Sequence, residues 1–196
     1  MNALDQTHMH PSARAALKQD TRDLLRLAMA LQGTDALICS REHAARHEAG
    51  HAVAYRDAGR RLLSVEVFRR GDDWLGYTRA AGPNWKVGPD TDPSADLIEV
   101  GILLAGPLAE LTTSQKPALG AGLDEISLAR SIVATAAHKI GADPSVVMLE
   151  MISATLDMLA LNRKTLDALS STLMKHRKLK GLELARVLRV AGAAKR

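Results

Sequence analysis

The residues with the clearest chemical potential are His47, Glu48 and His51, which form an HExxH pattern. Two histidines four residues apart lie on the same face of a helix, about one turn apart, where both imidazoles can bind one zinc ion. The glutamate beside the first histidine can take a proton from zinc-activated water and pass it to a leaving amine. The pattern predicts a zinc-dependent peptidase with Glu48 as general base, although HExxH also occurs by chance on amphipathic helices.

A third protein ligand is needed, because a catalytic zinc ion normally takes three. The candidates are Glu110, Asp124, Glu125, His138 and the nearby His43. His43 shares the helix face with the HExxH pair, but three histidines stacked at this spacing span about 12 Å, too far for one ion. Sequence spacing does not choose among the other four. The single cysteine, Cys39, excludes a four-cysteine zinc site and an intrachain disulfide.

The composition indicates a helical globular protein. The 196 residues fit one domain, or one domain with a helical appendage. Aromatic residues make up only 3%, so aliphatic side chains must build the core, which favours helices. The net charge of +4 is spread along the chain and does not favour nucleic acid as a partner. No apolar run approaches the roughly 20 residues of a membrane span, and no signal peptide is recognisable, so we expect a soluble, cytoplasmic protein.

Several elements must position the metal residues. Ser40 is a plausible N-cap for a helix that carries the HExxH pattern to about Asp57, and the small Ala49 and Gly50 let other elements pack close to it. Alternating residues at 62–69 and 74–78 around a turn predict a β-hairpin. The other predicted helices cover residues 12–32, 94–111, 123–140, 144–173 and 182–190, separated by loops at 82–94 and 115–122 and a break at 175–181. We therefore expect a mostly α fold, with an N-terminal helical extension at 1–39 and a peptidase domain at 40–196.

An ordered set of segments resembles the peptidase domain of FtsH-type AAA zinc metalloproteases. Residues 46–53 resemble that family's HEAGHA motif, and residues 63–67, 70–71 and 75–78 resemble the strand, turn and strand that follow it. Residues 104–110 resemble its GGRAAEE helix, and residues 120–124 are similar to its GASNDL segment. The C-terminal helices are similar as well, so the resemblance covers about residues 40–190.

The resemblance implies a zincin-like helical metallopeptidase domain with one zinc ion per chain. By analogy with the family, Asp124 would be the third ligand beside the two histidines. The family's small β element can bind an extended substrate strand through backbone hydrogen bonds. The corresponding residues are Val65, Val67, Gly76 and Tyr77, which we expect to contact substrate.

The chain also departs from the family. It contains neither a GxxxxGKS nor a GxxxxGKT phosphate loop and no membrane-spanning segment, so it resembles a free-standing peptidase domain. We expect cleavage of unfolded or flexible polypeptides, or dependence on a separate AAA ATPase. The family's hexamer is held partly by its ATPase ring, so the resemblance does not fix the oligomeric state here, and a homo-oligomer is one alternative. The alternative function is a catalytically weak module that binds peptides or regulates a partner ATPase.

Overall fold

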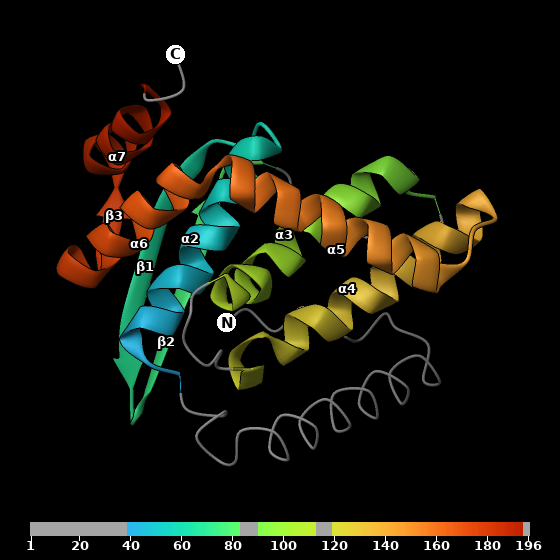
Figure 1. The fold of residues 1–196 in the computed structure, drawn as a ribbon, viewed down its shortest axis with the longest axis horizontal. Helices are drawn as coiled ribbons and strands as arrows, with labels where there is room; N and C mark the ends of the chain where they lie inside the picture. Colours follow the sequence, from blue (N-terminus) through green and yellow to red (C-terminus); the bar gives the residue numbers. More distant parts are fainter. Residues whose placement is uncertain (1–38, 83–89, 113–118, 194–196) are drawn as a thin grey trace.

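The computed structural model describes residues 39–82, 90–112 and 119–193. The elements, labelled as in Figure 1, are α2 (Arg41–Asp57), β1 (Leu62–Arg70), β2 (Asp73–Ala80), α3 (Pro93–Leu111), α4 (Leu119–Ile140), α5 (Pro144–Leu161), α6 (Arg163–His176), β3 (Lys178–Lys180) and α7 (Gly181–Ala193). The described part is mostly helical with one small antiparallel sheet, which agrees with the predicted mostly α class. The predicted helix at 12–32, and the N-terminal extension apart from Cys39, lie outside the described residues.

Helix α2 is the central element, with α3 on one side and the sheet and α6 on the other (Figure 1). It begins as predicted at Ser40, whose side-chain oxygen accepts a hydrogen bond from the backbone N–H of His43 at 3.2 Å. The His43 ring is reciprocally within 3.5 Å of the Ser40 backbone nitrogen, which completes a capping box. Every residue from position 44 to position 54 is buried, so the HExxH pattern lies in the interior and not on the surface.

The hairpin follows α2 as predicted, and a third strand joins it. The strand order is β2-β1-β3, with Val65 opposite Thr78 of β2 on one side and Leu179 of β3 on the other. Strand β1 is therefore central, and β2 is an edge strand of this sheet. Residues 178–180 were expected to be part of a break, and the structure instead shows a three-residue strand whose middle residue, Leu179, is fully buried.

Two helix boundaries differ from the sequence prediction. The helix expected at 144–173 is divided at Asn162 into α5 and α6. The Asn162 side-chain amide donates to the Met158 carbonyl at 2.9 Å, a local contact that competes with helix continuation. Helix α4 begins at Leu119, one turn before the expected start at residue 123.

Helix α5 is long and apolar enough, by length and composition alone, to cross a membrane. It is the one such helix in the described ranges, and only 17% of its 18 residues are buried. A single helix that meets these two criteria is weak evidence, because helices of soluble proteins meet them as well. The feature therefore does not establish a membrane span.

Candidate metal centre

Helix α2 brings the two histidines of the HExxH pattern together inside the protein. The Nε2 atoms of His47 and His51 lie 3.0 Å apart, and both side chains are buried. Each residue's side chain lies over the preceding turn of the helix, so a spacing of four residues stacks the two rings edge to face, with centroids 4.7 Å apart. The predicted pairing of His47 and His51 on one helix face is therefore confirmed.

Hydrogen bonds at the opposite ring nitrogens fix how each histidine is oriented. The Nδ1 atom of His51 lies 2.8 Å from the carbonyl oxygen of Ile102, which can only accept, so Nδ1 carries the hydrogen. The Nδ1 atom of His47 lies 2.7 Å from Oε1 of the buried Glu110, which accepts in the same way when ionised. Both Nε2 atoms therefore present lone pairs to a shared space, the tautomer that metal-binding histidines use.

The third member of the cluster is Glu125, from the first turns of α4. Its Oε2 atom lies 3.0 Å from Nε2 of His47, and its Oε1 atom lies 3.0 Å from Nε2 of His51. The three side chains could together hold a metal ion. Ligand atoms around a tetrahedral zinc ion, with bonds of 2.0–2.1 Å, are separated by about 3.3 Å. The two Nε2 atoms, 3.0 Å apart, are close to that separation, and one ligand atom from each of the three residues lies within 4.8 Å of the others.

The resemblance-based assignment of Asp124 as third ligand stays a prediction, and the structure offers Glu125 as a different candidate. Asp124 is exposed and lies outside the cluster, and Glu125 takes the position beside the histidines. Neighbouring residues on an α-helix point about 100° apart, so only one of the two can face α2. The other candidates have different places: Glu110 supports His47 from behind, His138 is exposed, and His43 belongs to the capping box of α2.

The electrostatics of the cluster fit a cation better than an empty space. Oε2 of Glu125 is buried and makes no hydrogen bond, although Nε2 of His47 is only 3.0 Å away. Two imidazole nitrogens and two carboxylate oxygens thus lie close together, an arrangement that is favourable when positive charge, from protons or a metal ion, lies among them. A donor set of two imidazoles and one carboxylate is also one that catalytic zinc sites use.

The pKa shifts have the same cause. Burial lowers the pKa of His47, but the Glu125 carboxylate and hydrogen bonds to Glu110 and Glu125 outweigh it, so the pKa lies well above its ordinary value. Burial also lowers the pKa of His51, but the Glu125 carboxylate outweighs this effect, so the pKa lies above its ordinary value. Burial raises the pKa of Glu125, but the two histidines hold it well below its usual range. The site therefore favours bound positive charge, whether protons or a metal ion.

Small residues let α3 pass directly beside the histidines. A methyl group on Gly106 would lie 2.4 Å from Nε2 of His51 and 2.6 Å from Nε2 of His47. Gly50 gives the same close approach from α2, because its methyl group would lie 2.3 Å from the carbonyl oxygen of Ala105. Such contacts are too short for any side chain larger than hydrogen. The space around the two lone pairs therefore depends on glycine at both helix surfaces.

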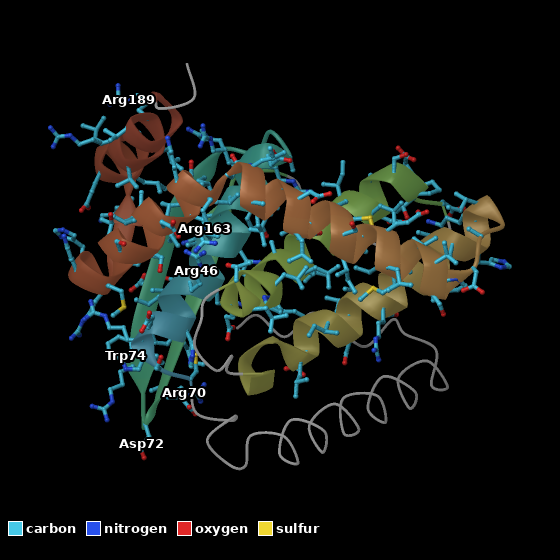
Figure 2. All side chains as sticks on the ribbon, in the orientation of Figure 1. Arg46, Arg70, Asp72, Trp74, Arg163 and Arg189 are labelled. Carbon is cyan, nitrogen blue, oxygen red and sulfur yellow. The ribbon has the colours of Figure 1, made fainter. Side chains whose placement is uncertain are left out.

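Arg46 connects α2 to the end of α3 that carries Glu110. Its guanidinium donates to the Ala109 carbonyl at 3.3 Å and to the Thr112 hydroxyl at 3.0 Å, and it pairs with Asp167 of α6. Figure 2 shows Arg46 close to Arg163, which binds the same Asp167 carboxylate at 3.2 Å. This network fixes the C-terminal turn of α3, and with it the position of Glu110.

Glu48, the predicted general base, lies under strand β2. Its side chain is buried, and its Oε2 atom is 2.8 Å from the Thr78 hydroxyl. Burial raises the pKa of Glu48, against the lowering effect of His51, His47 and Thr78. A buried carboxyl with a raised pKa beside a metal cluster is suited to accept and return a proton.

The predicted substrate contacts divide into two groups. Val65 and Val67 are 0% and 1% exposed and pack in the core from the central strand β1, so their side chains are not accessible to an extended polypeptide in this structure. Gly76 and Tyr77 lie on the edge strand β2. Tyr77 is partly exposed, and its hydroxyl donates to Glu66 at 2.8 Å. For these two residues a role in substrate binding stays a prediction.

Several contributors to the site were not predicted. Gly106 and Thr78 were not singled out, and the Ile102 carbonyl has no side-chain signal at all. Glu110 was considered only as a metal ligand. A glycine inside a helical pattern is a signal for close backbone approach, and Gly106 carries it.

The chain matches no protein-family model and no curated protein.

Proposed function

We propose that this protein is a zinc-dependent metalloendopeptidase related to the FtsH-type peptidase domain, with a zincin-like fold. One zinc ion per chain would be held by His47, His51 and Glu125. The observation that carries the proposal is the convergence of two histidine lone pairs and one carboxylate on a shared buried space, with Glu48 on the next residue of the same helix. This set of groups is the one that metal-assisted hydrolysis of an amide requires.

Each protein group has a distinct task in this reaction. When bound, zinc would polarise the scissile carbonyl and lower the pKa of a water molecule. Glu48 takes the proton from the attacking water and gives it to the leaving amine, so it is a base first and an acid afterwards. Its raised pKa favours the second transfer, because the protonated form is then stable enough to exist between the two steps.

Two acceptors behind the histidines orient the proposed ligand atoms. The Glu110 carboxylate and the Ile102 carbonyl hold the two imidazoles with Nε2 toward the ion. Glu110 has a further effect, since a carboxylate bound to Nδ1 increases the basicity of the ligand nitrogen. The two histidines are therefore not equivalent, and His47 is the more electron-rich ligand.

Substrate binding is assigned to the edge strand β2. Within the described residues β1 pairs with one edge of β2, and no described strand pairs with the other. An extended polypeptide could add to that edge through backbone hydrogen bonds, which demand little of its sequence. Gly76 and Tyr77 would lie along the bound chain. Only unfolded or flexible segments can adopt such a conformation, so these are the proposed substrates.

Partners and location follow from the same proposal. Folded substrates would need an AAA ATPase to unfold them, and a separate AAA ATPase is therefore a proposed partner. A homo-oligomer and a cytoplasmic location are further expectations from the sequence.

The test combines zinc content with casein cleavage for the wild type and for Glu48→Gln. We expect one zinc ion per chain in both proteins and a loss of cleavage of about 100-fold or more in the variant, the range for removal of a general base. Zinc binding without cleavage in either protein would favour the binding-module alternative. Absence of zinc from the wild type would contradict the proposal.

A further inference from the structure

The Glu48 side chain is held by the neighbouring sheet as well as by its own helix. The Thr78 hydroxyl of β2 lies 2.8 Å from Oε2 of Glu48 and 3.0 Å from the Glu48 backbone carbonyl oxygen. We propose that Thr78 is a positioning residue that sets the orientation of Glu48 for proton transfer. This inference rests on the proposed peptidase function, and its structural part can be tested without any activity.

Gly76 makes this contact possible. A methyl group at Gly76 would lie 2.4 Å from Cγ and 2.9 Å from Cδ of Glu48, so the strand backbone packs against the glutamate side chain. Residues 76 and 78 lie on the same face of β2, because side chains alternate along a strand. The backbone at Gly76 therefore confines the Glu48 side chain, and the Thr78 hydroxyl binds its carboxylate.

The register of the hairpin fixes both contacts. Gly76 pairs with Val67 and Thr78 pairs with Val65, and both valines are buried in the core. Because the side-chain period of a strand is two, a slip of one residue would turn Thr78 to the opposite face. The core packing of β1 therefore determines where the Thr78 hydroxyl meets the glutamate.

The hydroxyl can hold Glu48 before and after proton uptake. A hydroxyl has one hydrogen and can also accept, so it donates to the ionised carboxylate. After Glu48 has taken a proton from water on its other carboxyl oxygen, Oε2 can still accept the hydrogen bond from the Thr78 hydroxyl. The Thr78 hydrogen therefore keeps the same acceptor in both states. The side chain need not move between the two proton transfers.

This arrangement links substrate binding to the base. In the proposed reaction the outer edge of β2 pairs with the polypeptide, and the inner face of the same strand holds Glu48 through Thr78. The strand therefore sets the distance between the scissile bond and the base. Reactions of this kind lose rate steeply when such geometry loosens.

The kinetic test compares Thr78→Val, which keeps the shape and removes the hydroxyl, with Thr78→Ser, which keeps the hydroxyl. Thr172→Val is the matched control, because the Thr172 hydroxyl on α6 bonds only to the Ala168 carbonyl of its own helix. We expect Thr78→Val to keep one zinc ion and a KM within about twofold, with kcat lowered about 10- to 100-fold, as for a lost hydrogen bond to a charged group. Thr78→Ser should recover most of kcat, and Thr172→Val should match the wild type. A kcat for Thr78→Val within twofold of the wild type would overturn the inference.

A second measurement does not depend on activity. Crystal structures of the metal-free wild type and Thr78→Val should show the Glu48 carboxylate in different orientations. The same Glu48 orientation in both would overturn the positioning role. If the wild type fails to cleave casein, the proposed function fails, and this comparison still decides what Thr78 does.

Discussion

Replacing Gly106 with alanine should destroy the metal site while leaving most of the fold intact. The added methyl group would lie 2.4 Å and 2.6 Å from the Nε2 atoms of His51 and His47. To reach an ordinary contact of 3.4 Å, the nearer ring must withdraw by about 1 Å. Metal–ligand distances tolerate deviations of only about 0.2 Å. The displacement is therefore about five times larger than the site can accept.

We expect Gly106→Ala to lower zinc affinity by at least 100-fold, more than the 10- to 100-fold typical of second-shell changes, because both histidine ligands are displaced at once. A chromophoric chelator in competition with the protein measures this affinity. Overpacking should cost about 1–3 kcal/mol of unfolding free energy, so circular dichroism and denaturant unfolding must show that the variant is folded.

Gly101→Ala is the matched control on the same helix. Its methyl group would meet Cε of Met151 at 3.6 Å and Oγ1 of Thr155 at 3.8 Å, both ordinary contacts. Alanine also has the higher helix propensity, so this variant should keep its zinc affinity and gain up to about 1 kcal/mol of stability. A folded Gly106→Ala protein that binds zinc within tenfold of the wild type would refute the reasoning about the space beside the histidines.

Two further predictions concern the ligands. Glu125→Gln should lose zinc, and Asp124→Asn on the adjacent residue should retain it, as measured by metal content after dialysis; the reverse result would restore the assignment by resemblance. Zinc binding to the metal-free protein at pH 7 should also release protons. Burial lowers the pKa of both histidines, but the Glu125 carboxylate has the larger, opposite effect, so the net pKa of each is raised. The two histidines therefore hold more protons at pH 7 than free imidazoles do. Two histidines of ordinary pKa would release about 0.5 proton, and calorimetry in buffers of different ionisation enthalpy should give a larger number. A release of about 0.5 proton or less would contradict the predicted direction.

Local patterns were enough to predict α2 and the hairpin. The Ser40 cap, the HExxH spacing and the alternation at 62–69 each act within a few residues, and each element formed where expected. The third member of the candidate metal cluster was not predictable in this way, because Glu125 is far from His51 along the chain. Helix α4 starts four residues earlier than its sequence pattern suggested, and a single residue of helical phase separates Glu125 from Asp124.

The central position of β1 in the sheet was not predictable for a different reason. Alternation shows that a strand has two faces, but it does not show whether both of its edges are paired. That depends on β3, a three-residue strand near the other end of the described chain, too short to carry a pattern of its own. Val65 and Val67 therefore seemed to be available to substrate, although the pairing of Val65 with Leu179 makes β1 a central strand.

The charges of the site give an argument for a divalent ion that is independent of the resemblance. Three carboxylates, those of Glu48, Glu110 and Glu125, surround the two histidines. Buried carboxylates without compensation cost several kcal/mol each. In the metal-free protein protons must supply the positive charge, which agrees with the raised pKa values of both histidines and of Glu48. A divalent cation would displace those protons and favour the ionised form of Glu48. Binding of the ion would therefore both complete the site and leave Glu48 ionised, the form in which it can accept a proton. The same three carboxylates link ion binding to proton transfer.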